Sequence, residues 1–175
     1  MENRTTRETF PTLTTERLTL RQLSDSDVQE IFLLRSDPLV NKYLNRQPTQ
    51  TLEDALEFIE KIRTNNSYYW AIVPKGDEKL VGTISLFEVS DELKKCEIGY
   101  ELLTEYQGKG LMREAAIRVI EYISRTLEFN TIDAYTHRKN LNSANLLHAM
   151  KFIPWEQDDT TSSDLMVFRL NISRK

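Results

Sequence analysis

The sequence predicts a single α/β domain. Its 175 residues, 39% of them hydrophobic, have the size and balance of one globular domain that buries its own core. Segments with the alternating pattern of strands and segments with the three- and four-residue spacing of helices follow one another. One extended run, 97–103, meets a helical pattern, 111–127, through two glycines. We expect one domain over residues 13–172, preceded by a polar, flexible arm over residues 1–12.

The first half of the chain has the pattern of one strand, a group of helices and a group of strands. Strands are expected over residues 16–23, 68–73, 79–87 and 95–103, and helices over 28–35, 39–44 and 52–65. Thr51 to Asp54 is close to a capping box, which begins the last of these helices. The turn-forming residues 74–78 favour a hairpin. The group of strands is therefore expected to form an antiparallel meander.

The second half begins with the helix at 111–127, whose apolar residues form one stripe. An alternating strand is expected over residues 131–137, and a short helix follows Asn140. Two further strands, at 155–157 and 164–170, are separated by a turn-forming segment and close the domain.

The junction between strand 97–103 and the next helix has the properties of a phosphate cradle. The first N–H groups of a helix lack backbone partners and carry the positive end of its dipole, so they attract anions. Gly108 and Gly110 have no Cβ atoms and let a diphosphate approach these amides. Lys109 and Arg113 add positive charge. A helix start with two convenient glycines is the alternative interpretation of this stretch alone.

Two other nucleotide-binding motifs are excluded at this junction. A P-loop needs four residues between its first glycine and a Gly-Lys-Ser/Thr, which residues 108–112 do not supply. A dinucleotide fingerprint needs a third glycine where Arg113 stands, and the expected acidic residue at the end of a following strand is missing.

The junction resembles the coenzyme A loop of the GNAT acyltransferases, in which Gln or Arg and two further residues precede Gly, any residue, and Gly or Ala. Residues 107–112 fit this pattern from Gln107 to Leu111, with Met112 in place of the final small residue. Gly-Leu-Met followed by Glu-Ala resembles the branch of the RimJ/RimL ribosomal-protein N-acetyltransferases. The opening Thr-Glu-Arg-Leu of strand 16–23 also resembles the start of such domains.

A second stretch, residues 140–152, resembles another GNAT signature, with Asn140 and Ser143 in the matching places. Helix capping is the alternative role of these two residues. Leu147 stands where many GNAT enzymes have a tyrosine that protonates the leaving thiolate. Lys151 replaces the usual glycine at the end of the helix, where a lysine resists a positive φ.

The resemblance covers about residues 14–172 and implies the GNAT fold. That fold is a mixed, mostly antiparallel sheet of six to seven strands with about four flanking helices. It further implies acetyl-CoA as the co-substrate, with no metal. The implied cofactor-binding residues are Tyr100, Leu102, Leu103, Gln107, Gly108, Lys109, Gly110, Leu111, Met112, Arg113, Asn140 and Ser143.

The implied reaction is direct attack of a primary amine on the thioester. A base is useful because amines are largely protonated at neutral pH. Glu97 is the expected base, Glu101 the alternative carboxylate, and pairing with Lys94 or Lys95 the ordinary role of Glu97. Without the tyrosine, Ser143 or a water is expected to protonate the thiolate.

Tyr100 and Tyr135 could also protonate the thiolate, although tyrosines in strands more often pack. The leading acceptor is a protein N-terminal α-amine. The alternatives are a small amine, such as a polyamine, amino acid analogue or aminoglycoside, and an acyl-CoA binder without turnover. Substrate specificity is expected in residues 44–50, beside the acceptor site of the family.

Composition narrows the possible partners and the cellular location. The net charge of −4 and the lack of a basic stripe with interleaved aromatics disfavour nucleic-acid binding. No apolar run approaches the length of a membrane span, and no signal segment opens the chain, so we expect a cytoplasmic protein without a membrane partner. One cysteine and two histidines leave little for a disulfide framework or a zinc site. A monomer and a homodimer are both compatible with the sequence.

Overall fold

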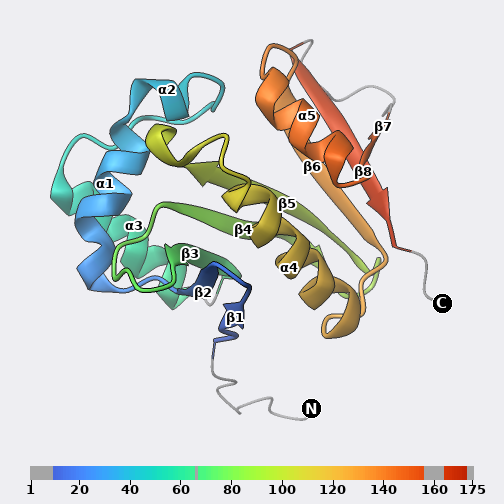
Figure 1. Ribbon diagram of the computed structural model, residues 1–175, viewed down its shortest axis with the longest axis horizontal. Coiled ribbons are helices and arrows are strands. Elements are labelled where there is room, and N and C mark those ends of the chain that lie inside the picture. The colour runs from blue at the N-terminus through green and yellow to red at the C-terminus, as the bar shows by residue number, and fades with distance from the viewer. Residues whose placement is uncertain (1–9, 66, 156–163, 173–175) are drawn as a thin grey trace.

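The computed structural model describes residues 10–65, 67–155 and 164–172, and these form one mixed sheet with helices on both faces (Figure 1). The sheet order is β1-β2-β3-β4-β5-β6-β8-β7, and only β5 and β6 pair in parallel. The strands are β1 (Leu13–Thr14), β2 (Leu18–Gln22), β3 (Tyr69–Pro74), β4 (Gly82–Ser90), β5 (Lys95–Leu102), β6 (Thr131–His137), β7 (Ile153–Trp155) and β8 (Leu165–Asn171).

The helices agree with the sequence pattern except in their lengths. They are α1 (Val28–Ser36), α2 (Pro38–Asn41), α3 (Leu52–Thr64), α4 (Leu111–Arg125) and α5 (Leu141–Ala149). Thr51 and Asp54 form the predicted capping box at the start of α3. Helix α2 is shorter than predicted, and Asp37 caps it by accepting a hydrogen bond from the Leu39 amide.

The strand count exceeds the six to seven that the resemblance implies. The additional strand β1 is two residues long and carries no readable alternation, so only its pairing with β2 identifies it. It begins at the predicted domain boundary, whereas residues 1–9 of the predicted arm lie outside the described residues. Residues 156–163, which include the end of one predicted strand and the turn-forming segment, also lie outside them.

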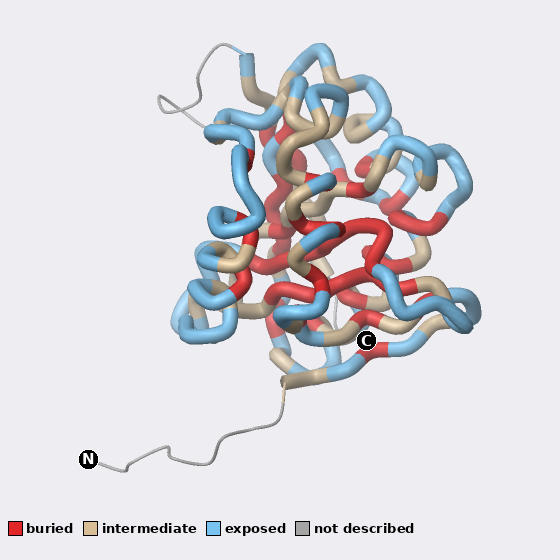
Figure 2. The backbone as a smooth tube through the Cα atoms, turned by 90° about the vertical axis from the view of Figure 1, so that its left-hand side faces the viewer, coloured by how far each residue is buried: buried red, intermediate tan, exposed pale blue. Residues whose placement is uncertain are grey.

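Two hydrophobic cores lie on opposite faces of the sheet. Helix α4 packs its apolar stripe against one face, where Trp70 and Ile72 of β3 are fully buried. Helices α1 and α3 pack against the other face, where the alternate β3 residues Tyr69 and Ala71 are buried. Strand β3 is therefore buried on both faces, which explains its continuous apolar sequence. Figure 2 shows this buried centre surrounded by exposed loops and helix faces.

Strands β5 and β6 diverge after a short parallel contact. Lys95 to Glu97 pair with Thr131 to Asp133, and no described pairing continues this ladder beyond Glu97 (Figure 1). At the contact, the fully buried Asp133 carboxylate accepts hydrogen bonds from Arg169 (Nε, 2.7 Å) and lies 2.7 Å from Lys95 Nζ. This ion cluster fixes the point from which the two strands separate, because a buried carboxylate requires charged partners.

Helix α5 ends in the tight turn that Lys151 was expected to resist. Lys151 adopts a φ of 70°, its amide donates to the His148 carbonyl, and the Phe152 amide donates to the Leu147 carbonyl (both 3.0 Å). These bonds form a Schellman motif, and Leu147 and Phe152 are both buried beneath it. The expected difficulty is therefore overcome: the hydrogen bonds and the buried contact hold a lysine in the left-handed region.

Among the described residues, no helix combines the length and the apolar composition needed to cross a membrane.

Candidate active site

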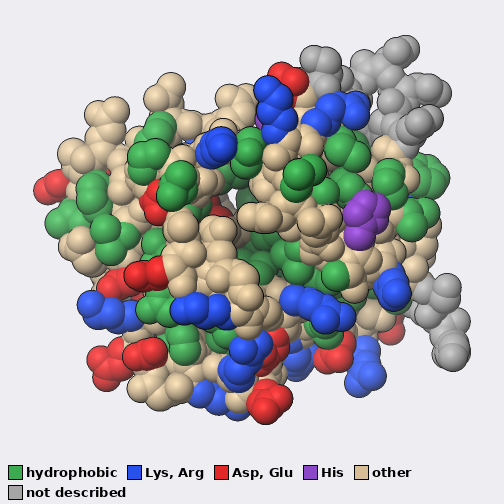
Figure 3. Space-filling model, turned by 45° about the horizontal axis from the view of Figure 1, so that its top comes forward, with side chains coloured by type: hydrophobic (Ala, Val, Ile, Leu, Met, Phe, Trp, Pro, Cys, Tyr) green, Lys and Arg blue, Asp and Glu red, His purple; other side chains and the backbone are tan. Residues whose placement is uncertain are grey.

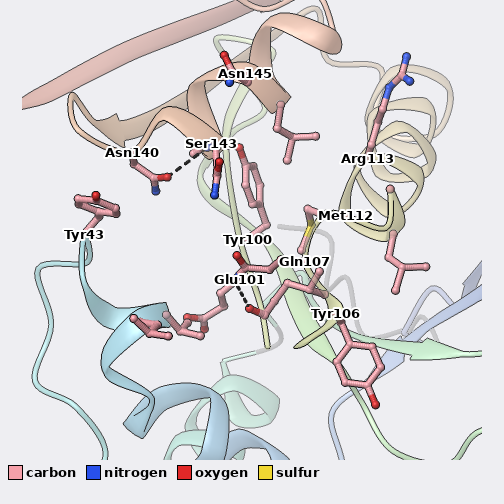
Figure 4. A pocket seen from close by; sticks show the side chains of 18 of the residues that line it. Tyr43, Tyr100, Glu101, Tyr106, Gln107, Met112, Arg113, Asn140, Ser143 and Asn145 are labelled. Atoms are coloured by element: carbon pink, nitrogen blue, oxygen red, sulfur yellow. Dashed lines mark hydrogen bonds between the residues drawn. The ribbon is translucent and has the colours of Figure 1, made fainter. Parts of the chain in front are cut away.

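A cavity of about 500 Å³ lies where β5 has separated from β6. Its lining comes from helix α2 and the residues after it, the end of β5, the glycine loop with the start of α4, and the start of α5. Figure 4 shows side chains from these elements converging on it, and Figure 3 shows the hollow that they surround on the molecular surface. The divergence of two strands thus creates a site that four separate segments line.

The glycine loop places unpaired amides on one wall of this cavity. Gly110 is the N-cap of α4 with a φ of 77°, and Gly108 has a φ of 73°. Within the described part of the chain, no backbone carbonyl accepts a hydrogen bond from the amides of residues 108–113. A Cβ atom on Gly108 would meet nothing within 4 Å. The loop therefore presents amides and open space, which fits a bound diphosphate.

A clamp from the N-terminal part of the domain holds this loop. We use the term Arg17–Glu114 clamp for the contacts among Thr15, Arg17, Lys109 and Glu114. The Glu114 carboxylate accepts hydrogen bonds from Thr15 Oγ1 (2.6 Å), the Arg17 amide (2.8 Å) and Arg17 Nε (2.7 Å). Arg17 Nη1 also donates to the Lys109 carbonyl (3.1 Å). One arginine therefore fastens the glycine loop to the first turn of α4.

The clamp also controls the charge of Glu114 beside the cradle. Partial burial acts to raise the pKa of Glu114, but the hydrogen bonds from Thr15 and Arg17 outweigh burial and lower it. The carboxylate therefore stays ionised and paired. The sequence does not reveal this role of Arg17, because nothing in the spacing of its residues indicates that strand β2 begins beside α4.

The Gln107 side chain binds the protein backbone at the cavity wall. Its Nε2 donates to the Leu102 carbonyl at 2.9 Å. This bond closes the turn between β5 and the glycine loop, and both residues line the cavity.

Tyr100 and Ser143 meet inside the cavity, as Figure 4 shows. The Tyr100 hydroxyl lies 3.0 Å from Ser143 Oγ. Asn140 Oδ1 accepts from the Ser143 amide at 3.2 Å, so the capping role of Asn140 is observed. Burial raises the pKa of Tyr100 to about 12, which keeps its hydroxyl protonated at neutral pH. Two hydroxyl groups therefore stand side by side, one of them on a helix N-terminus.

The two candidate carboxylates differ in position. Glu101 lines the cavity, but Arg46 Nη2 lies 2.6 Å from its Oε2, and Arg35 lies 4.0 Å from its Oε1. Glu97 does not line the cavity, and the Phe87 ring covers Gly99 between the two glutamates. Burial, followed by repulsion from Glu88, raises the pKa of Glu97. Glu97 therefore has the raised pKa that suits a general base, whereas Glu101 lies at the cavity, where a base would have to act.

The structure brings most of the predicted site residues together. Glu97, Leu103 and Lys109 are the predicted residues that do not line the cavity. Residues that line it without having been expected include Leu39, Val40, Tyr43, Tyr106, Asn142, Asn145 and Leu146. Those on α2 and after it lie just before the segment 44–50 that was expected to hold specificity. No sequence signal marks them, because irregularly spaced apolar residues also suit an ordinary connection.

The sequence of this chain is similar to those of known acetyltransferases. The family described as acetyltransferase (GNAT) domain matches residues 17–153. The uncharacterized N-acetyltransferase p20 of Bacillus licheniformis is 32% identical over 81% of this chain and 82% of its own length. The ribosomal protein uS5-alanine N-acetyltransferase of Escherichia coli is 26% identical over 80% of this chain and 77% of its own length.

Solved acetyltransferase structures have the same fold. Spermidine N-acetyltransferase from Vibrio cholerae, in complex with CoA and spermine, aligns with a TM-score of 0.77, covering 90% of this chain and 96% of that chain. Its sequence identity is 20%, so the likeness concerns the fold alone.

Proposed function

This chain belongs to the GNAT acetyltransferase family, and we propose that it transfers the acetyl group of acetyl-CoA to the α-amine of a protein N-terminus. The observation that carries the proposal is the cavity at the divergence of β5 and β6, with a diphosphate cradle on one wall and a hydroxyl pair on another. Both substrates would occupy this cavity at once, so that the amine attacks the thioester directly.

Acetyl-CoA fits the chemistry of the cradle residues. The amides of Gly108 to Arg113 would bind its diphosphate, with the positive charge of Arg113 at the cavity wall. The glycines give these amides their orientation, and the Arg17–Glu114 clamp keeps the loop in place. Bound there, acetyl-CoA supplies the activated acetyl group. The exposed edge of β5, near Tyr100 and Leu102, would hold the pantetheine arm, with Leu103 and Lys109 as outer contacts.

The charge of the cavity supports an α-amine over a polyamine. Among the described lining residues, the only carboxylate is Glu101, and Arg46 already neutralises it. A polycation would therefore enter a site without a free negative partner. An α-amine, with a pKa near 8, also has a neutral fraction a few hundred times larger than that of a lysine side chain at neutral pH. The Escherichia coli relative is named for acetylating an alanine of a ribosomal protein.

Glu97 is the proposed base, acting through water. Water is proposed as the intermediary because Glu97 does not line the cavity and the Phe87 ring covers Gly99, between Glu97 and Glu101. The raised pKa of Glu97 suits a group that takes up a proton from solvent water near the site.

Ser143 is the proposed proton donor to the departing sulfur. As the C–S bond breaks, the Ser143 hydroxyl would give its proton to the sulfur and take a proton from the Tyr100 hydroxyl, 3.0 Å away, and solvent water would then return a proton to Tyr100. This pair would replace the tyrosine that is absent at Leu147, whose side chain is fully buried.

A competition between acceptors tests the proposal. The protein is incubated with acetyl-CoA and a peptide with a free N-terminal alanine, the same peptide with a blocked N-terminus and an internal lysine, or spermidine. Thiol release gives the rate, and mass spectrometry gives the acetylated position. We expect acetylation of the free α-amine only. Faster acetylation of spermidine or of the lysine would overturn the assignment of the acceptor, although the family membership would stand.

A further inference from the structure

The acceptor end of the cavity has a basic border, although the whole chain carries a net charge of −4. We define the acceptor mouth as residues 39–46 and 137–142. Tyr43 of the first segment and Asn140 of the second line the cavity, and the rings of Tyr43 and His137 lie 5.3 Å apart. The two segments contain Lys42, Arg46, Arg138 and Lys139, and no aspartate or glutamate. They border the end of the cavity that faces away from the glycine loop, where Arg46 is paired with Glu101 and where Lys42 and Lys139 add positive charge.

Two carboxylates near the mouth, those of Asp37 and Glu101, are already engaged. Asp37 accepts from the Leu39 amide (2.7 Å) and from Thr104 Oγ1 (3.3 Å). Glu101 faces two arginines, since Arg46 pairs with it and Arg35 lies 4.0 Å away. Arg35 Nε is buried and has no hydrogen-bond partner among the described residues. Behind the mouth, positive charge therefore exceeds the negative charge that Glu101 supplies.

Two lysines of the mouth are available to a ligand. Lys42 and Lys139 are exposed, and neither forms an ion pair with any part of the chain that the structure describes. Lys42 Nζ lies 5.2 Å from the centre of the Tyr43 ring, so its charge stands beside a residue of the cavity wall. Lys139 follows His137, whose Nδ1 accepts from the Lys139 amide at 3.1 Å. The positive charges of Lys42 and Lys139 therefore act on an acceptor molecule as it enters the cavity.

We propose that the preferred acceptor carries negative charge next to its amine, as an N-terminal peptide does when aspartate or glutamate occupies its second to fourth positions. This inference rests on the proposed acetylation of protein α-amines and adds a substrate class to it. An extended peptide advances about 3.5 Å per residue, which places these side chains within about 10 Å of the reacting amine. Leu39 and Leu44, exposed on the cavity wall, supply apolar contact to the same segment.

The size of the preference is worked out from Coulomb attraction, with a separation of about 10 Å taken between each lysine and each carboxylate. Two lysines acting on two carboxylates at about 10 Å, in water and screened at physiological ionic strength, favour an acidic peptide over a basic one by roughly fivefold in kcat/KM. Lower salt lengthens the range of the interaction and should increase the ratio. A preference that arises from apolar contacts alone would not respond to salt in this way.

The experiment compares three peptides that share an N-terminal alanine and differ only at positions two to four, which are acidic, neutral or basic. Thiol release with saturating acetyl-CoA gives kcat/KM for each at two salt concentrations. The variant is Lys42→Glu combined with Lys139→Glu. The matched control is Lys61→Glu combined with Lys75→Glu, which changes the net charge equally at exposed positions that do not line the cavity. Circular dichroism establishes that both variants fold.

For the wild type and the control we expect the order acidic, neutral, basic, and for the mouth variant the reverse order. Equal rates for the three peptides, or a reversal in the control as well, would overturn the inference while leaving α-amine acetylation intact. If the protein binds acetyl-CoA saturably but acetylates none of the three peptides, the proposal that it acts on protein α-amines is wrong. The inferred preference for acidic peptides is then wrong as well. The two failures are thus distinguished by whether any peptide is a substrate.

Discussion

Replacing Arg17 by alanine should weaken coenzyme A binding although Arg17 does not line the cavity. The substitution removes the hydrogen bond to the Lys109 carbonyl (3.1 Å) and the ion pair with Glu114 (2.7 Å). The Arg17 side chain is 48% exposed, so its ion pair contributes at most about 1 kcal/mol, and the hydrogen bond that orders the loop adds about 1 kcal/mol. The unpaired Glu114 charge would also repel the diphosphate from the first turn of α4.

These contributions amount to about 1.5 kcal/mol, or roughly a tenfold increase in the dissociation constant of coenzyme A. Calorimetric titration measures that constant directly, and steady-state kinetics should show a similar rise in the KM for acetyl-CoA with kcat nearly unchanged. Arg17→Lys should be intermediate, because a lysine keeps the charge near Glu114 without the planar fork that also reaches Lys109. Combining Arg17→Ala with Glu114→Gln should recover part of the affinity, since it removes the unpaired charge.

Arg118→Ala is the matched control for this prediction. Arg118 also joins α4 to the N-terminal part of the domain, through a 3.3 Å hydrogen bond from Nε to the Thr14 carbonyl, but it lies farther along the helix and does not contact the glycine loop. Coenzyme A affinity should be unchanged in this variant. Wild-type affinity in Arg17→Ala, or equal losses in the two variants, would refute the reasoning that the clamp positions the cradle.

Further predictions concern stability and proton transfer. Lys151→Gly should raise the free energy of unfolding by about 1 kcal/mol in denaturant titration, because glycine adopts the φ of 70° without strain; an unchanged or lower value would contradict this. Asp133→Asn should cost about 3 kcal/mol, since it leaves Arg169 and Lys95 without their buried partner. Arg169 and Lys95 lower the pKa of Asp133 despite its burial, so its contribution is present above about pH 4 and lost as the pH falls further. Thermal melts of the wild type should show this acid loss, and melts of the variant should lack it. Ser143→Ala should reduce kcat roughly a hundredfold with unchanged coenzyme A affinity, and Tyr100→Phe should reduce it less; equal kcat in the wild type and Ser143→Ala would exclude Ser143 as the proton donor.

Local patterns predicted the parts of the fold that rest on local chemistry. The capping box at Thr51 and the glycine loop could be read from residue types, because caps and helix starts depend on neighbours in the sequence. The extra strand β1 could not be, because two residues carry no periodicity and their pairing is decided by β2. Lys151 shows the opposite failure: local preference opposed the turn, and buried contacts of Leu147 and Phe152 overcame it.

In the candidate site, too, residues within a local motif could be predicted from the sequence, and contacts between distant segments could not. Gly108 and Ser143 were found from motifs, and the structure places both at one cavity. The Arg17–Glu114 clamp, and the pairing of Arg46 with Glu101, join residues far apart in the chain, so no spacing rule reveals them. Glu97 is the expected base, but it does not line the cavity, and the Phe87 ring covers Gly99 between Glu97 and Glu101, which only side-chain packing shows.

Calorimetric titration of acetyl-CoA into the wild type, Gly108→Glu and Gly76→Glu tests whether the glycine loop is the acetyl-CoA site. Both glycines have positive φ angles (73° and 90°) with nothing within 4 Å of an added Cβ, so the two substitutions impose similar backbone strain. Only Gly108 lies at the cradle. We predict saturable binding to the wild type and to Gly76→Glu, and its loss in Gly108→Glu, where a carboxylate would stand in the diphosphate site. Equal binding to both variants, or no binding to the wild type, would contradict the assignment of this loop as the acetyl-CoA site.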